Sequence, residues 1–202
     1  MSELKLNGPV VYISKIPESI SVTKLASEER NLEILKTSNE RAKIEKYYAF
    51  RVLERAICKE LDGSIEDLQI HKNENGRWMG RGLDFSLSHS VNAVAVALSP
   101  EPIGVDIEAA IGKSYGGLAK KYLCADEYRE YEALSAEERE LYFLSKWTAK
   151  EALFKSLNEG KFVPSRVNPK SSDTVCHVMN IDGEKYVLSV ASKNKAIKLK
   201  TV

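Results

Sequence analysis

Residues 83–108 read LDFSLSHSVNAVAVALSPEPIGVDIE, and this stretch decides the fold. Leu83–Ser99 contains two runs of β-forming residues, and we expect the chain to break between them near His89-Ser90. Residues 99–102, SPEP, form a connector, because proline interrupts regular structure. Ile103–Glu108 alternates apolar and polar residues and predicts another strand. The middle of the chain therefore predicts strands that follow one another without a helix between them.

Helices and further strands are predicted on both sides of this stretch. Toward the N-terminus the pattern predicts a strand at Pro9–Ile16, helical structure at Ser27–Leu61, a short strand at Leu68–Lys72 and a turn at Asn73–Gly76. Toward the C-terminus it predicts helices at Ala125–Leu134 and Ala136–Leu157 and strands at Thr174–Asn180, Glu184–Val190 and Lys195–Thr201. This order lacks strict strand–helix alternation and indicates an α+β fold with mainly antiparallel sheets.

Three local signals refine these boundaries. Thr37 and Glu40 have the spacing of a capping box, which predicts that a helix begins there, and Asp62-Gly63 predicts its end. Asp182-Gly183 predicts a tight hairpin between two strands. The connector near residue 100 divides the chain into residues 1–100 and 101–202. The similar element content of these halves suggests a pseudo-repeat.

Composition narrows the class of protein. The 202 residues are 43% hydrophobic and 29% charged, with a net charge of +1, as in ordinary globular proteins. This balance argues against a dedicated nucleic-acid binder. Three separated cysteines without a CxxC motif predict free thiols in a reducing cytoplasm. We expect no signal peptide and no membrane span, because no apolar stretch approaches about 20 residues.

The segment GVDIE, residues 104–108, places two carboxylates on one face of a strand. Alternate strand residues share a face, so Asp106 and Glu108 lie side by side opposite the apolar Val105 and Ile107. Two such hard oxygen ligands suit Mg²⁺ bound together with substrate phosphates. The alternative is a solvated acidic face, from which Asp106 could be removed without opening a core cavity.

The segment WTAKEALFK, residues 147–155, predicts a helical stripe of charged residues. Trp147, Glu151 and Lys155 lie above one another at spacings of four, and Lys150 lies beside them. Such a group could hold a metal, a proton and phosphate oxygens. The alternative is an exposed Glu–Lys pair with Trp147 as a core anchor.

The segment FSLSHS, residues 85–90, ends a strand with hydroxyl groups and a histidine. Ser88 and His89 could donate hydrogen bonds to phosphate, but strand neighbours face opposite ways, so they do not form a nucleophile–base pair. The alternative is a strand end with an incidental histidine. Basic residues on the first-half helix and the following turn are either phosphate contacts or solvated charges: Arg41, Lys43, Lys46, Arg51, Arg55 and Arg77.

Taken together and in this order, LSHS, GVDIE and WTAKEALFK resemble the three signature blocks of the 4′-phosphopantetheinyl transferase superfamily. The spacing is similar to that of the surfactin-synthetase-activating type, a single chain, and not to that of the short trimeric synthases. The resemblance implies two α+β halves related by a pseudo-twofold axis, with coenzyme A in the cleft between them. It also implies a cytoplasmic monomer that uses neither nucleic acid nor membrane.

The same resemblance assigns the residues. It implies that Asp106, Glu108 and Glu151 bind Mg²⁺, that Glu151 is also the base, and that Lys155 neutralises the leaving phosphate. Ser88, His89 and Lys150 would hold coenzyme A phosphates. Arg77 stands where the family usually has lysine in a Gly-Lys-Pro block, here Gly76-Arg77-Trp78. Lys46 or Arg51 would add a phosphate contact, and Glu127 matches an acidic position of the family.

The implied reaction moves the 4′-phosphopantetheine arm of coenzyme A onto a serine of an apo acyl-, peptidyl- or polyketide-carrier protein and releases adenosine 3′,5′-bisphosphate. Such a transfer depends on positioning and charge neutralisation, and the nucleophile belongs to the partner. The sequence leaves two alternatives open. One is a Mg²⁺-dependent phosphohydrolase that attacks with water, and the other is a non-catalytic module that binds coenzyme A.

Overall fold

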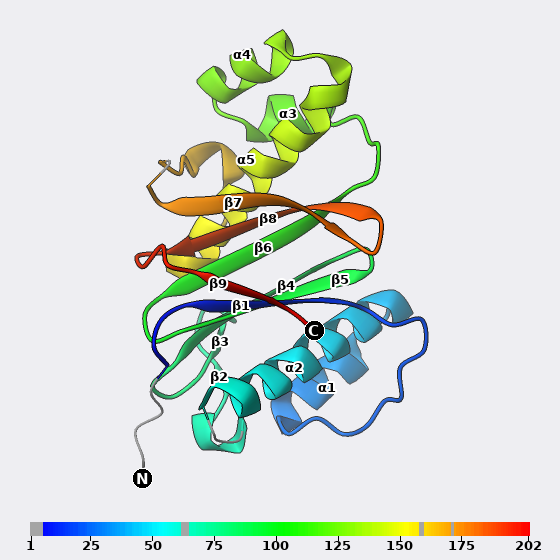
Figure 1. Cartoon of the computed structure of the whole chain (residues 1–202), viewed down its shortest axis with the longest axis vertical. Coiled ribbons are helices and arrows are strands. Elements are labelled where there is room, and N and C mark those ends of the chain that lie inside the picture. Colours follow the sequence, from blue (N-terminus) through cyan, green and yellow to red (C-terminus); the bar gives the residue numbers. More distant parts are fainter. Residues whose placement is uncertain (1–5, 62–64, 158–159, 171) are drawn as a thin grey trace.

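The computed structural model describes residues 6–61, 65–157, 160–170 and 172–202. Two β-sheets lie at the centre, with helices at both ends of the long axis (Figure 1). One end holds α1 (Glu28–Lys36) and α2 (Glu40–Leu61). The other holds α3 (Gly116–Tyr122), α4 (Ala125–Ala133) and α5 (Ala136–Leu157). The predicted α+β class is confirmed.

The strands form two main sheets. The first has the order β4-β5-β1-β9, with β1 at Val10–Lys15, β4 at Asp84–Ser90, β5 at Ala93–Ser99 and β9 at Lys198–Thr201. The second has the order β6-β8-β7, with β6 at Ile103–Ala110, β7 at Thr174–Ile181 and β8 at Glu184–Ser192. Pairing is antiparallel except between β1 and β9. A small pair, β2 (His71–Lys72) and β3 (Trp78–Met79), and the 3₁₀ turns η1 (Ile65–Leu68) and η2 (Pro164–Arg166) complete the described elements.

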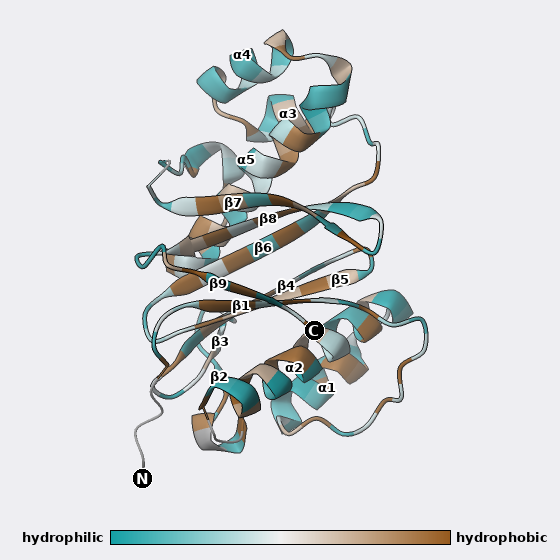
Figure 2. Cartoon of the chain, in the orientation of Figure 1, coloured by the Kyte–Doolittle hydropathy of each residue, from teal (hydrophilic) through white to brown (hydrophobic). Residues whose placement is uncertain are grey.

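Apolar side chains join these layers. Phe50, Leu53 and Ile57 recur at helical spacing on α2 and pack beneath the first sheet. Between the two sheets, the alanines of β5 meet Val105 and Ile107 of β6 in a second core. Figure 2 shows the hydrophobic residues gathered on these central strands. No helix within the described residues is long and apolar enough to cross a membrane.

The last strand returns to the first-half sheet. After the β7–β8 hairpin, β9 pairs in parallel with β1, in the register Val10 to Lys198. Lys200 binds Glu60 on α2, which also accepts a hydrogen bond from Tyr12. The division into residues 1–100 and 101–202 stays a prediction, and β9 lies across it.

Several predicted boundaries need correction. Strand β4 continues through His89-Ser90, and the chain turns at Val91-Asn92, where Val91 has a φ of 51°. In the predicted strand at 68–72, Leu68 ends the 3₁₀ turn η1, Gln69 lies in a turn, and among the described residues only His71–Lys72 pair as a strand.

The helix starts also differ from the sequence pattern. Asn39 caps α2 by accepting from Ala42, while Thr37 ends α1. Helix α3 was not predicted, because its two glycines disfavour a helix. The predicted helix end at Asp62-Gly63 lies outside the described residues.

Candidate active site

A close approach of helix α5 to strand β6 brings the predicted carboxylates together. Gly104 makes it possible: a Cβ there would lie 1.9 Å from the carbonyl oxygen of Ala152 on α5. Only glycine lets the two backbones meet so closely. Gly104, Asp106 and Glu108 share one face of β6. This face therefore lies against α5 at the turn that begins with Glu151.

This placement excludes the alternative of a solvated acidic face. Asp106 is only 3% exposed, and β6 is covered both by the first sheet and by α5. Its Oδ1 accepts hydrogen bonds from Ser88 Oγ at 2.7 Å and from Lys155 Nζ at 2.7 Å. Its Oδ2 is buried and has no hydrogen-bond partner among the described residues. An orphaned carboxylate oxygen of this kind is a candidate ligand for a cation.

Lys155 lies between two of the carboxylates. Its Nζ is 2.7 Å from Asp106 Oδ1 and 3.5 Å from Glu151 Oε2. Burial alone would lower the pKa of Lys155, but the charges of Asp106 and Glu151 outweigh burial and raise it. The side chain is thus a fixed positive charge, and it is still 29% exposed.

Two carboxyl groups in this cluster are held with raised pKa values. Burial, followed by the neighbouring charge of Asp106, raises the pKa of Glu151 to about 7, and Lys155 opposes this shift. Burial also raises the pKa of Glu108, against the hydrogen bond from Ser90. Buried groups whose negative charges repel one another favour a bound proton or a bound cation.

The donor set fits a hard divalent cation. Asp106, Glu108 and Glu151 supply oxygen ligands of the type that Mg²⁺ prefers, and Asp106 Oδ2 lacks another partner. Among the described residues, no three His, Cys, Asp or Glu side chains already form a compact metal cluster. The ammonium of Lys155 binds the other oxygen of Asp106, Oδ1, at 2.7 Å.

A pocket of about 300 Å³ opens beside this cluster. It is lined by the turn before β3, by β4 and by the end of α5, including Arg77, Trp78, Leu87, Phe154 and Lys155. Lys155 therefore belongs both to the pocket wall and to the carboxylate cluster. The arrangement can hold a ligand with an apolar part and an anionic part, and Lys155, which binds Asp106, is a cation on its wall.

Arg77 lies at this pocket and joins both halves of the chain. Its guanidinium donates to Asp84 Oδ2 at 2.6 Å and to the carbonyl of Ile103 at 2.9 Å. Its second terminal nitrogen is buried without a partner in the described part of the chain. A phosphate contact through this nitrogen would therefore need the buried guanidinium to move toward the pocket.

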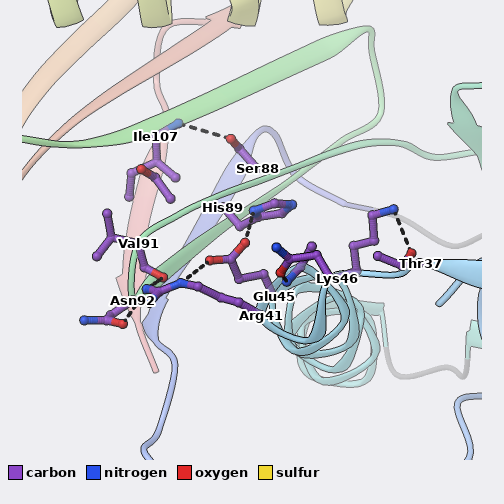
Figure 3. Close-up of polar contacts among 12 residues, drawn as sticks. Thr37, Arg41, Glu45, Lys46, Ser88, His89, Val91, Asn92 and Ile107 are labelled. Carbon is purple, nitrogen blue, oxygen red and sulfur yellow. Dashed lines mark hydrogen bonds and ion pairs between the residues drawn. The ribbon is translucent and has the colours of Figure 1, made fainter. Parts of the chain in front are cut away.

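His89 of β4 faces helix α2, which carries Lys46 (Figure 3). His89 Nδ1 is 3.1 Å from Glu45 Oε2, and Glu45 also binds Arg41. Burial lowers the pKa of His89, the carboxylate of Glu45 opposes this, and the nearby cations Lys155, Arg30 and Lys46 lower it further. Lys46 Nζ binds Thr37 at 3.2 Å and Glu33 at 3.4 Å. A phosphate reaching His89 would therefore meet cations whose charge Glu45 and Glu33 partly balance.

Lys150 does not join this group. Its side chain is 1% exposed, and its Nζ binds Glu127 Oε2 at 2.9 Å and the carbonyl of Val167 at 2.6 Å. Glu127 also accepts from the backbone N–H of Cys124 at the start of α4. A phosphate contact of Lys150, as the sequence predicts, would require this buried pair to open.

Two residues that contact the predicted site residues were not assigned a role from the sequence. Ser90 donates to Glu108 Oε2 at 2.6 Å, and Glu45 orients His89. The alternating serines of FSLSHS were a usable signal for Ser90, because alternate strand residues share a face. Glu45 had no such signal, since it is one of several acidic residues on a long helix.

Comparisons with known proteins agree with these features. The sequence model of the 4′-phosphopantetheinyl transferase superfamily matches residues 102–201. The chain is 34% identical over 113 residues to the 4′-phosphopantetheinyl transferase psf-1 of Bacillus pumilus, covering 54% of this chain and 48% of that protein. It is 25% identical over 133 residues to the transferase gsp of Aneurinibacillus migulanus, covering 64% and 56% respectively.

A third relative shows the same partial coverage. Over 80 residues the chain is 34% identical to the 4′-phosphopantetheinyl transferase Sfp of Bacillus subtilis (strain 168), covering 40% of this chain and 35% of that protein. The chain spans about half the length of the first curated relatives that it matches.

Proposed function

The chain belongs to the 4′-phosphopantetheinyl transferase superfamily, and from this premise we propose that it transfers the 4′-phosphopantetheine arm of coenzyme A to a serine of an apo carrier protein. One observation carries the proposal. Lys155 lines the pocket beside β4 and at the same time binds Asp106, whose second oxygen is buried without a partner. A phosphate group entering this pocket would meet an ammonium and a set of carboxylates able to share a cation.

Mg²⁺ would be held by Asp106, Glu108 and Glu151. When bound, it supplies positive charge that neutralises the pyrophosphate of coenzyme A during the transfer. The raised pKa values of Glu108 and Glu151 support this assignment, because burial and the neighbouring charge of Asp106 disfavour their ionised forms and a cation would offset this effect.

Glu151 would act as the base. It receives the proton of the carrier serine as the serine oxygen forms its bond to the phosphorus that carries pantetheine. The bond from that phosphorus to the bridging oxygen breaks, and adenosine 3′,5′-bisphosphate leaves with the bonding electrons. In the metal-free protein the pKa of Glu151 is about 7, so its carboxyl group can exchange a proton near neutral pH.

The remaining residues would bind coenzyme A. Lys155 stabilises the charge that develops on the leaving phosphate, and Arg77 adds positive charge to the wall of the pocket. His89 and Lys46 contact phosphate from the side of α2. Ser88 acts through Asp106, to which its hydroxyl donates. We further propose that coenzyme A lies between two halves related by a pseudo-twofold axis, in a Mg²⁺-dependent monomer of the cytoplasm.

The proposal is tested with purified protein, coenzyme A, Mg²⁺ and several apo carrier proteins. Intact-mass analysis is expected to show one added phosphopantetheine arm on a carrier and none on the same carrier with its acceptor serine replaced by alanine. Release of the nucleotide without modification of any carrier would favour a phosphohydrolase instead. Binding of coenzyme A without turnover would favour a non-catalytic module.

A further inference from the structure

Strands β4 and β6 are joined by a row of side-chain hydrogen bonds. Every second residue of β4 accepts a hydrogen bond from a backbone N–H of β6. The acceptors are Asp84, Ser86, Ser88 and Ser90, and the donors are Ile103, Val105, Ile107 and Ala109, at 2.8, 3.1, 3.3 and 3.1 Å respectively. We call these four acceptors the polar ladder.

The polar ladder provides hydrogen-bond acceptors for the free edge of strand β6. Strand β6 is an edge strand of its sheet, because among the described strands it pairs with β8 alone. The N–H groups on its other side are largely buried and need acceptors. Strand β4 belongs to the other sheet, and its side chains supply those acceptors at a constant spacing along both strands. The ladder therefore fixes the register of one sheet against the other.

Two rungs of the polar ladder also touch the carboxylate cluster. A serine hydroxyl has one proton to donate and can accept at the same time. Ser88 accepts from Ile107 and donates to Asp106 Oδ1, and Ser90 accepts from Ala109 and donates to Glu108 Oε2 at 2.6 Å. Ser86 accepts from Val105 and touches neither carboxylate.

We propose that Ser90 is a positioning residue for Glu108: one hydroxyl seats β6 against β4 and orients a carboxylate of the metal site. The inference rests on the proposed function, which assigns Glu108 to Mg²⁺. A hydroxyl bound to one carboxylate oxygen leaves the other free to face a cation and limits rotation of the side chain. The register between the sheets and the geometry of the site are then set by the same hydroxyl group, through two hydrogen bonds.

Substitution of two neighbouring rungs separates this role from a purely structural one. Ser90→Ala and Ser86→Ala each leave one backbone N–H of β6 without its acceptor, but only Ser90→Ala frees a carboxylate. The measurement is a titration with Mn²⁺ in the absence of coenzyme A, in which electron paramagnetic resonance counts free Mn²⁺. Displacement by Mg²⁺ identifies the shared site, and thermal unfolding is followed for each variant.

We expect the parent protein to bind Mn²⁺ and Ser90→Ala to bind it about 10- to 100-fold more weakly. Ser86→Ala is expected to keep the parental affinity despite a similar loss of thermal stability. Ser90→Thr, which keeps a hydroxyl, is expected to recover most of the affinity. Equal Mn²⁺ affinity in Ser90→Ala and the parent would overturn the positioning role alone. An absence of Mn²⁺ binding in the parent would overturn both this role and the Mg²⁺ site of the proposed function.

Discussion

At the scale of single residues, the site is defined by buried charge. Asp106 has one oxygen held by Ser88 and Lys155 and one without a partner in the described part of the chain. Burial and the negative charge of Asp106 both raise the pKa of Glu151, a neighbouring carboxyl group. The chemical properties of Glu151 therefore depend on the carboxylate beside it.

The first prediction concerns the pKa of Glu151, measured by carbon-detected nuclear magnetic resonance in metal-free buffer. In the parent protein this carboxyl is expected to titrate near pH 7. Asp106→Asn removes the negative charge beside Glu151. It also removes the other carboxylate that binds Lys155, so the positive charge of Lys155 acts more strongly on Glu151. Both changes lower the pKa of Glu151. An unchanged or higher value in Asp106→Asn would contradict the described electrostatics.

The second prediction follows from the sign of the same shift. A carboxyl whose pKa is raised by folding binds more protons in the folded state between its unfolded and folded pKa values, so stability falls as pH rises from about 4.5 to about 7. A divalent cation bound by the carboxylates stabilises their charged forms and offsets this loss of stability. Mg²⁺ is therefore expected to raise the melting temperature more at pH 8 than at pH 5.5. A larger effect at the lower pH would count against the carboxylates as its ligands.

Sequence reasoning found the residues of this site but not their surroundings. The alternation in GVDIE correctly predicted that Asp106 and Glu108 share a face. It could not reveal that α5 covers this face, because burial depends on a helix that begins 30 residues after Asp106. For the same reason, the side chain of Lys150 looked available, although a buried ion pair with Glu127 encloses it.

At the scale of elements, the contact between α5 and β6 organises the site. The strong patterns predicted its parts well: α5 begins and ends where the sequence indicated, and the Asp182-Gly183 hairpin has positive φ at both residues, 47° and 85°. Weaker patterns failed where tertiary contacts decide, as at η1 and in the glycine-containing α3.

The third prediction tests the approach of α5 to β6. Gly104→Ala would place a methyl group 1.9 Å from the carbonyl of Ala152, and neither backbone can yield without moving α5. We expect a loss of about 3 kcal/mol or more in the free energy of unfolding. Gly117→Ala on α3 is the matched control, since no atom lies within 4 Å of its new Cβ and alanine favours the helix.

Urea denaturation of both glycine variants provides the measurement. Gly117→Ala is expected to unfold at or above the parental midpoint. If Gly104→Ala unfolded at the parental midpoint as well, the described packing of α5 on β6 would be wrong.

At the scale of the whole molecule, several contacts join the two sheets. The second core lies between them, the polar ladder joins β4 to β6, and β9 returns to pair with β1. Arg77 adds bonds to Asp84 and to Ile103. None of these links between distant segments could be derived from local sequence patterns, although the element content of both halves could.

The fourth prediction is that the two halves unfold together. The chain has two tryptophans, and Trp78 lies against Phe50 in the first half while Trp147 lies against Phe143 in the second. Trp78→Phe and Trp147→Phe each leave one fluorescent reporter. Within each variant, the fluorescence transition in urea is expected to coincide with the loss of circular dichroism. Separate transitions within one variant would show that the halves unfold independently.

The central claim is that the carboxylates between β6 and α5 form the metal-dependent centre of a transferase. The most direct measurement is the rate of phosphopantetheine incorporation into an apo carrier as a function of Mg²⁺ concentration. The variants are Asp106→Ala and Glu151→Gln, with Asp126→Ala, an exposed carboxylate on α4, as the control. Circular dichroism verifies that each variant is folded.

We predict that Asp106→Ala transfers far more slowly than the parent and recovers partly as Mg²⁺ is raised, because a weakened site fills by mass action. Glu151→Gln is predicted to lose about 10²- to 10⁴-fold in rate without recovery, since excess metal cannot replace a base. Asp126→Ala should match the parent. Parental transfer rates from folded Asp106→Ala at low Mg²⁺ would contradict the claim.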